Sequence, residues 1–302
     1  MYTQMLVPLD GSTTAEKVLP YAHYFVGKFK IPVQLLAVVD IAKMVTHISA
    51  DRARFVDTMI ENGVRSSENY LREVAKTFPG AVVKCTVEKG RAEEVIIEKG
   101  KTDTGMLITM ATHGRSGLNR FLLGSIAEKV LRGTANPLML VRATREAKSE
   151  GAATLKSIIV PLDGSELAES VLPMVAGVAQ KLDLEVVLFR AYHISYTPYA
   201  NNEAYYVGVN SSELIASARD EANEYLEKKT AEVKNLGVKK VKYASKEGIA
   251  SDEIIALGRG TPDNLIAMCS HGRTGMERWV VGSVTETVVR HSDEPVLVVR
   301  AK

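Results

Sequence analysis

The amino-acid sequence repeats itself once, and this internal repeat limits the possible fold more than any other feature. MLVPLDGSTTAEKVLPYA, which begins at Met5, aligns with IIVPLDGSELAESVLPMV, which begins at Ile158. ATHGRSGLNRFLLGSIAEKVLR, which begins at Ala111, aligns with CSHGRTGMERWVVGSVTETVVR, which begins at Cys269. The first pair is offset by 153 residues and the second by 158, so the second half carries five extra residues in between. The chain therefore consists of two copies of one folding unit.

Within each copy, short runs rich in Val, Ile and Leu alternate with amphipathic stretches. In the first copy the predicted strands are MLVPL, VQLLAVV, AVVKCTV, MLITM and PLMLVR, and the predicted helices cover about 13–28, 52–78, 92–99 and 124–132. Strands that are apolar throughout are typical of sheets buried on both faces. Strand-helix alternation predicts parallel strands with right-handed crossovers. Each half is therefore expected to be a doubly wound, Rossmann-like α/β domain with a five-stranded parallel sheet.

The segment ATREAKSEGAATLK, at 143–156, is small and charged and has no apolar period, which is typical of a linker. We therefore expect one domain at 1–144 and a second at 155–302. The five extra residues fall in or near HISYTPYANNEAYYVG, at 193–208. Because this tyrosine-rich segment follows the second strand of its half, it is a candidate lid, although a connector packed on its own aromatics is the more common outcome.

Composition excludes several classes of protein. The formal net charge is only +2, so no broad basic surface for nucleic acid or for an anionic membrane is expected. Neither a secretory signal nor a long apolar run is found at the N-terminus or elsewhere, and a soluble, cytoplasmic protein is expected. The two cysteines, Cys85 and Cys269, lack the spacing of a zinc site. We expect both to act as small apolar residues on or beside strands.

The loop after the fourth strand carries the clearest functional signal. In an open parallel sheet, ligands bind beyond the carboxyl ends of the strands where the strand order reverses. Gly114 and Gly117 allow the main chain to approach a ligand closely, and Gly124-Ser125 opens a helix whose first N–H groups suit a phosphate. A plain glycine-rich connector is the alternative, but the repetition of every glycine and of the serine favours phosphate binding.

Other motifs favour structure over catalysis. A turn followed by a helix cap would be enough to explain Asp10-Gly11-Ser12. The GKT at 100–102 is not a phosphate-binding P-loop, because Val95 stands where its first glycine is needed, and neither a G-x-G-x-x-G nor a G-x-S-x-G motif occurs. His113 and His271 have no nucleophile at a fixed spacing, so we interpret them as residues that position the loop.

These residues resemble the universal stress protein family over nearly the whole chain. Its nucleotide-binding members carry G-x2-G-x9-G-[S/T] after the fourth strand, which Gly114 with Gly124-Ser125 and Gly272 with Gly282-Ser283 match. The first glycine of the pattern falls on Ala111 and on Cys269. The resemblance implies the adenine nucleotide alpha hydrolase-like fold, a strand order of 3-2-1-4-5, and edge-to-edge pairing of the last strands as an intramolecular pseudo-dimer.

The resemblance also implies residue roles. Asp10 and Asp163 would lie near the ribose, and Val38 would contact adenine through its backbone; the second half has Ala191 at that position, beside Arg190 and Tyr192. No catalytic residue or metal ligand is predicted. The predicted nucleotide contacts are Pro8, Leu9, Asp10, Val38, Ala111, His113, Gly114, Arg115, Gly117, Gly124, Ser125 and Ile126 in the first half, and Pro161, Leu162, Asp163, Ala191, Cys269, Gly272, Arg273, Gly275, Gly282, Ser283 and Val284 in the second.

Three hypotheses of function follow. The first is a regulatory stress-response protein that binds ATP, or ADP or AMP, at one site per domain, with Mg²⁺ on the phosphates. The second is a slow ATPase or nucleotidyl-transfer enzyme built on the same site, at most with weak hydrolysis. The third is an interaction module without a ligand, an alternative that the altered second half favours. A homodimer and an unidentified regulatory protein partner complete the expectations.

Overall fold

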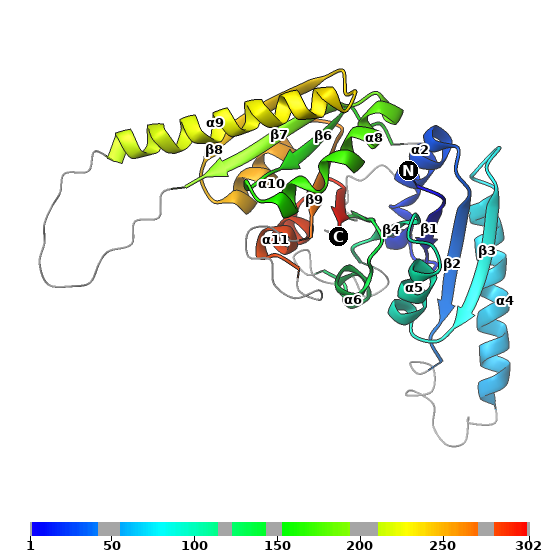
Figure 1. Cartoon of the computed structure of the whole chain (residues 1–302). Coiled ribbons are helices and arrows are strands. Elements are labelled where there is room, and N and C mark those ends of the chain that lie inside the picture. Colours follow the sequence, from blue (N-terminus) through cyan, green and yellow to red (C-terminus); the bar gives the residue numbers. More distant parts are fainter. Residues whose placement is uncertain are drawn as a thin grey trace, which may run out of the picture.

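The computed structural model describes residues 2–41, 55–113, 123–142, 153–193, 211–270 and 281–300. The first half contains β1 (Met5–Pro8), α1 (Thr13–Glu16), α2 (Leu19–Phe29), β2 (Val33–Val39), α4 (Val56–Ala75), β3 (Val83–Lys89), α5 (Ala92–Lys101), β4 (Leu107–Ala111), α6 (Ser125–Gly133) and β5 (Leu138–Val141). The second half contains β6 (Ser157–Pro161), α7 (Glu166–Glu169), α8 (Leu172–Leu182), β7 (Glu185–Tyr192), α9 (Ser211–Asn235), β8 (Val241–Glu247), α10 (Ala250–Gly260), β9 (Asn264–Cys269), α11 (Ser283–His291) and β10 (Val296–Val299). The two halves therefore repeat one succession of strands and helices (Figure 1).

The strands form one ten-stranded sheet in the order β3-β2-β1-β4-β5-β10-β9-β6-β7-β8. Neighbours within each half are parallel, and each half has the predicted order 3-2-1-4-5. The last strands of the two halves pair antiparallel, with Leu297 opposite Met139. The predicted fold and the edge-to-edge pairing are confirmed, and this pairing merges the two five-stranded sheets into one.

Helices cover both faces of the sheet, as period-two strands require. In β2, Leu35 packs with Phe25 of α2 and Leu71 of α4, whereas its neighbour Leu36 packs on the opposite face with Ile96 of α5. The second half repeats this arrangement, with α8 and α9 on one face and α10 and α11 on the other. Each of the two core clusters includes residues of both halves, so the halves share their hydrophobic interior.

The predicted helix at 13–28 is wrong in one respect, because the structure breaks it into α1 and α2. Pro20 lies in the first turn of α2 and has no N–H to donate. Before it, the Val18 N–H bonds to the Ala15 oxygen in a tighter turn, and regular pairing resumes where the Ala22 N–H bonds to the Val18 oxygen. Pro173 stands at the same place in α8, so the break is part of the repeated unit.

The outermost strands also depart from the prediction of apolar strands. β3 and β8 lie at the two edges of the sheet, and both contain several polar and charged residues. Charged edge strands of this kind resist pairing with other chains. Cys85 lies exposed on β3, whereas Cys269 is buried at the end of β9.

At the junction between the halves, one arginine of each half donates hydrogen bonds to the end of a helix in the other half. Arg142, which follows β5, donates to the carbonyl oxygen of His291 at the end of α11 (3.1 Å). Arg300, which follows β10, donates to the carbonyl oxygens of Thr134 (3.0 Å) and Leu131 (3.0 Å) at the end of α6. Because the carbonyl end of a helix is its negative pole, each arginine stabilises a helix of the other half.

Four charged residues of the repeated skeleton meet at the same junction. Arg132 of α6 pairs with Glu286 of α11 (3.1 Å), and Arg290 of α11 pairs with Glu128 of α6 (3.6 Å). Each arginine also pairs with the glutamate four residues before it on its own helix, at 3.3 Å in α6 and 2.7 Å in α11. The repeated Glu and Arg of the sequence therefore serve the contact between the two halves.

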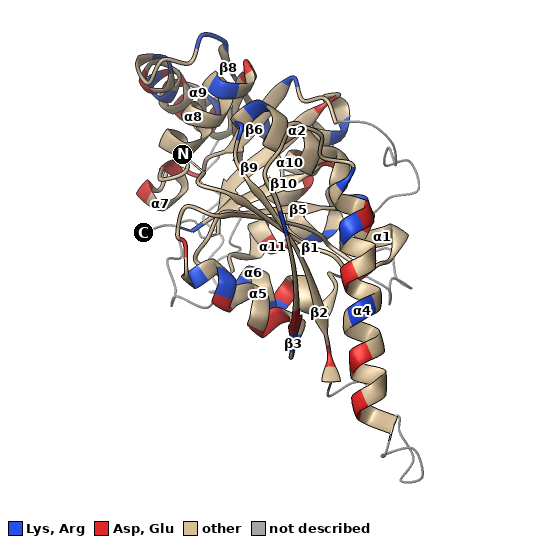
Figure 2. Cartoon of the chain, turned by 90° about the vertical axis from the view of Figure 1, so that its right-hand side faces the viewer, with Lys and Arg blue, Asp and Glu red and all other residues tan. Residues whose placement is uncertain are grey.

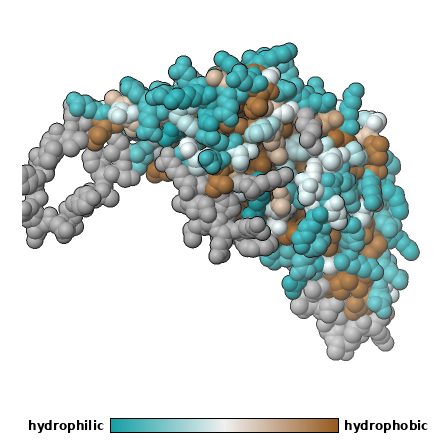
Figure 3. All heavy atoms as spheres, in the orientation of Figure 1, coloured by the Kyte–Doolittle hydropathy of each residue, from teal (hydrophilic) through white to brown (hydrophobic). Residues whose placement is uncertain are grey.

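The surface is mixed in charge and mostly hydrophilic. Acidic and basic residues both occur along α4 (Figure 2), and hydrophilic side chains predominate on the face shown in Figure 3. Among the described residues, no helix combines the length and the apolar character needed to span a membrane.

The junction also contains a carboxyl group with an unusual proton affinity. Glu294 corresponds to Asn136 of the first half, whose side-chain amide donates to the oxygens of Asp103 (2.7 Å) and Met106 (3.2 Å). Burial, together with the charges of Asp293 and Asp263, raises the pKa of Glu294 to about 7. Burial and the charges of Glu294 and Asp263 likewise raise the pKa of Tyr21 of α2 to about 12.

Replacing Glu294 by glutamine should stabilise the protein at high pH. A carboxyl whose pKa rises on folding is fully tolerated below its usual value near 4.5 and destabilises the folded state as pH rises to about 7. Glutamine resembles the protonated form, so Glu294→Gln should raise the free energy of unfolding at pH 8 by about 1 kcal/mol after solvent screening. It should change little at pH 4.5. Denaturant unfolding at both pH values, with exposed Glu227→Gln as the control, measures this, and equal gains at both would contradict it.

Candidate functional site

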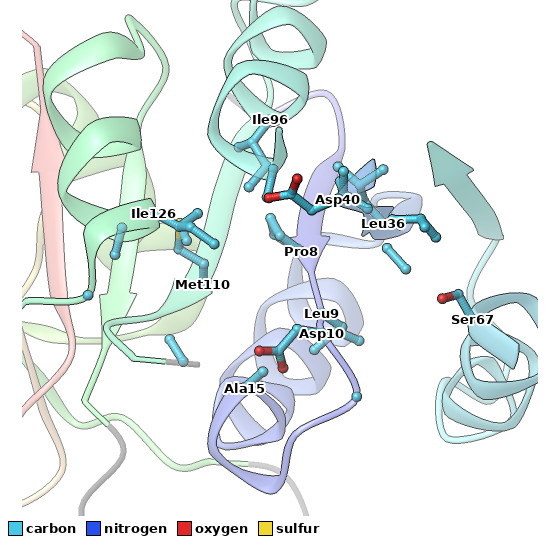
Figure 4. A pocket seen from close by; sticks show the side chains of 18 of the residues that line it. Pro8, Leu9, Asp10, Ala15, Leu36, Asp40, Ser67, Ile96, Met110 and Ile126 are labelled. Atoms are coloured by element: carbon cyan, nitrogen blue, oxygen red, sulfur yellow. The ribbon is translucent and has the colours of Figure 1, made fainter. Parts of the chain in front are cut away.

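A cavity of about 750 Å³ opens at the carboxyl ends of β1, β2 and β4 in the first half. Figure 4 shows Ile96, Met110 and Ile126 on one side of Pro8, and Ser67 of α4 on the other. This is the point where the strand order reverses between β1 and β4, the usual ligand position in open parallel sheets. Its lining includes nine of the predicted contacts: Pro8, Leu9, Asp10, Val38, Ala111, His113, Gly124, Ser125 and Ile126.

Asp10 shapes the turn that follows β1. Its Oδ1 accepts hydrogen bonds from the backbone N–H (2.9 Å) and the hydroxyl (2.6 Å) of Ser12, and Ser12 Oγ in turn accepts from the N–H of Ala15 and caps α1. Asp163 and Ser165 repeat this geometry in the second half. The turn and the cap are therefore real, and they hold an exposed carboxylate at the cavity wall.

Gly124 places the start of α6 against the end of β4. Its N–H donates to the Thr112 oxygen (2.8 Å), and a Cβ at this position would lie only 2.8 Å from the same oxygen. Gly124, the N-cap residue of α6, has no side chain that could accept from the helix, so the first N–H groups, beginning with Ser125 and Ile126, lie at the cavity as hydrogen-bond donors. In the second half, the Gly282 N–H donates to the Ser270 oxygen (2.8 Å), and this glycine is likewise the N-cap residue of α11.

His113 follows β4 at the cavity wall. Its Nδ1 lies 3.0 Å from the Thr112 hydroxyl, and within the described part of the chain its buried Nε2 has no hydrogen-bond partner. Burial lowers the pKa of His113, and the charge of Arg142 lowers it further. The imidazole is therefore neutral at pH 7, so it can donate or accept one hydrogen bond at the cavity without adding charge.

Part of the predicted site lies outside the described residues. This applies to Gly114, Arg115 and Gly117 in the first loop, to His271, Gly272, Arg273 and Gly275 in the second, and to the candidate lid from 194 onward. The remaining second-half contacts occupy positions equivalent to those of the first half: Pro161, Leu162 and Asp163 at β6, Ala191 on β7, Cys269 on β9, and Gly282, Ser283 and Val284 at α11.

Sequence reasoning missed the wall that α4 contributes. Gly63, Ser66, Ser67 and Tyr70 line the cavity, and the Tyr70 hydroxyl donates to Glu16 Oε1 (3.0 Å). Their spacing of three, four and seven residues places them on one helix face. This stripe of small and polar residues was the signal, in a helix that buries Leu71 and Val74 in the core.

Asp40, at the end of β2, was missed as well, and it adds a second carboxylate to the lining (Figure 4). The described residues nevertheless contain no cluster of three or more His, Cys, Asp or Glu side chains that could hold a metal ion. The site thus combines an apolar wall, two acidic side chains and a row of helix N–H donors. Such a lining suits a ligand with a flat apolar part, hydroxyl groups and an anionic end.

A sequence model of the universal stress protein family matches residues 1–142 and 154–300. The chain belongs to this family, as two tandem copies. Universal stress protein MJ0531 of Methanocaldococcus jannaschii is 32% identical over 146 residues, 48% of this chain and 82% of that protein. MJ0577 of the same organism is 32% identical over 157 residues, 49% of this chain and 96% of that protein.

Solved structures of similar fold also span both halves of the chain. A universal stress protein from Archaeoglobus fulgidus aligns over 100% of both chains, with a TM-score of 0.71 and 21% identity. At this identity the likeness shows the fold, and the chemistry of the site has to come from the residues themselves.

Replacing Gly124 by alanine should disturb the site through the backbone. Because the new methyl group would press on the Thr112 oxygen, we expect Gly124→Ala to lower the free energy of unfolding by about 1–3 kcal/mol. Gly27→Ala is the matched control: Gly27 is exposed within α2, a Cβ there meets nothing within 4 Å, and the change should stabilise by up to about 1 kcal/mol. Thermal unfolding of both variants measures the contrast, and equal effects would contradict the close approach.

Proposed function

We propose that the first-half cavity binds an adenine nucleotide, with ATP as the leading candidate over ADP and AMP, and that the chain is a nucleotide-binding regulatory protein. The observation that carries this proposal is the start of α6, where a glycine, which has no side chain to cap the helix, is the N-cap residue beside a cavity of about 750 Å³. Helix N-termini favour phosphate groups through both their free donors and their positive dipole. Pockets of a few hundred to about a thousand Å³ suit ligands of this size.

The lining supports a division of roles. The base would lie at the end of β2, where Val38 would meet its edge through its backbone. The apolar side chains of Ile96, Met110 and Ile126 would cover one side of the base, and the α4 wall would cover the other. Asp10 would accept hydrogen bonds from the ribose hydroxyls. Gly124, Ser125 and Ile126 would hold the phosphates, together with the glycine loop at 114–117.

Magnesium would enter with the nucleotide. The described residues supply no cluster of three metal-ligating side chains, and Mg²⁺ commonly binds nucleotides through phosphate oxygens and water with few protein ligands. Mg²⁺ would therefore neutralise phosphate charge, and its binding should depend on the nucleotide.

Slow hydrolysis at this site is the competing function. Phosphoryl transfer needs an oriented nucleophile and positioned charge, and one oxygen of Asp10 already accepts two hydrogen bonds from Ser12. We therefore propose binding without substantial turnover. A steady release of phosphate above about one per minute, lost in Asp10→Ala, would replace this proposal by an enzymatic one.

We also propose the domain bounds, the cellular location and the partners that the sequence predicts. The folding units are proposed at 1–144 and 155–302, in a cytoplasmic protein with access to cellular ATP. A further homodimer and a regulatory protein partner are proposed as the means by which the bound nucleotide is sensed.

Two measurements test nucleotide binding. Purified protein should release an adenine nucleotide when it is denatured, and emptied protein should bind ATP in calorimetry with Mg²⁺ present. Absence of both would overturn the proposal and leave an interaction module without a ligand.

Asp10→Asn tests the ribose contact without removing the turn. Asparagine keeps an oxygen that can accept from Ser12, but it lacks the charge that strengthens hydrogen bonds from the ribose, so affinity should fall about tenfold or more. Asp163→Asn is the matched control for the turn, because Asp163 makes the same 2.9 Å and 2.6 Å bonds to Ser165. Both variants should show similar thermal stability, and unchanged affinity in Asp10→Asn would contradict the assigned role.

A further inference from the structure

The two halves differ at the wall between the second strand and the long helix. β1 places Pro8 opposite Leu36, and β6 places Pro161 opposite Phe189, so the next residues, Ala37 and Arg190, correspond. On the helices, Tyr70 donates to Glu16 and Tyr225 donates to Glu169, at 3.0 Å and 2.8 Å.

The residues four positions before these tyrosines, Ser66 and Glu221, therefore correspond as well. Ala37 and Ser66 both line the first-half cavity. The second half thus has an arginine and a glutamate where the first half has two small residues.

The Arg190 side chain makes one contact with the Tyr225 ring and one at the surface, where Glu221 is 74% exposed. Its guanidinium carbon lies 4.9 Å from the centre of the Tyr225 ring, and its Nη2 lies 3.0 Å from Glu221 Oε1. Its side chain is only 11% exposed. A cation over an aromatic face and an ion pair stabilise each other in such a site, because both limit the same guanidinium to one position.

These contacts lie within the counterpart of the ligand cavity. Burial raises the pKa of Tyr225; the charges of Glu169 and Asp163 raise it further, and that of Arg190 lowers it. Asp163, the equivalent of Asp10, follows β6, which pairs with β7, the strand that carries Arg190. In the first half, the corresponding Tyr70, Ala37 and Asp10 surround open space.

We propose that Arg190, held between Tyr225 and Glu221, closes the base end of the second-half site, so that the chain binds one nucleotide, in its first half. This inference rests on the proposed function of the first-half cavity. A neutral adenine offers no counter-charge to Arg190, and it would have to displace the guanidinium from the face of Tyr225. The second half would then lose an ion pair and a cation–π contact for each base that entered.

The number of nucleotides bound per chain tests the proposal. Calorimetry of emptied protein with ATP and Mg²⁺ should give about one site per chain for the wild type. The double variant Arg190→Ala with Glu221→Ser restores the first-half residues and should give about two. The matched control is Glu224→Ser with Lys228→Ala, an exposed ion pair of 2.7 Å on the same helix, and it should stay at one.

The reciprocal change supplies a second arm. Ala37→Arg with Ser66→Glu should lower the affinity of the first-half site at least about tenfold, and thermal unfolding reports whether this variant is folded. The gain of a site in the first double variant cannot arise from unfolding, so the test does not depend on the second.

The possible outcomes distinguish closure of the second half from nucleotide binding by the first half. Two sites in the wild type, or one site in the Arg190→Ala, Glu221→Ser variant, would overturn the closure of the second half while leaving nucleotide binding intact. Absence of any ATP affinity in every variant would instead overturn the proposed function, and this inference with it.

Discussion

The antiparallel pairing of β5 with β10 is the contact on which the architecture depends. Each half alone would present its last strand, a run of buried residues such as Met139 or Leu297, as an unpaired edge. Edges of that kind invite aggregation. Pairing the two edges removes both at once and creates an approximate two-fold relation between the halves. That relation brings Arg142 and Arg300 to the helix of the opposite half, where they satisfy carbonyl groups that would otherwise be left without donors.

The residues repeated in the two halves serve two different purposes. Glu128 and Arg132, with Glu286 and Arg290, are repeated because each pair meets the other across the junction. Gly124 is repeated with Gly282 for a different reason, since each packs the start of a helix against a strand end and leaves helix donors facing outward. A repeated motif therefore does not by itself indicate two equal binding sites, because the fold alone would preserve much of it.

Most of the fold could be predicted from the sequence, because buried parallel strands and crossover helices leave strong hydrophobic patterns. The break between α1 and α2 was missed although Pro20 marked it, since the amphipathic pattern continues across the proline. The α4 wall of the cavity was missed for another reason: hydrophobic periodicity reports which face meets the core, and Ser66 and Ser67 lie beside that face. The position of Arg190 depends on Tyr225, which is distant in sequence and comes near only when β7 packs against α9.

The difference between the halves also has a thermodynamic side. An open cavity leaves its lining without packing partners, and a ligand that binds only the folded state adds stability in proportion to its concentration relative to its dissociation constant. The first half would therefore gain stability from a nucleotide, whereas the second half already contains Arg190, Tyr225 and Glu221 as permanent contacts. The start of α6 lies at the cavity, and further along the same helix Arg132 pairs with Glu286 of the second half. A ligand that contacts the start of α6 would therefore also affect the ion pair between Arg132 and Glu286 at the junction of the two halves.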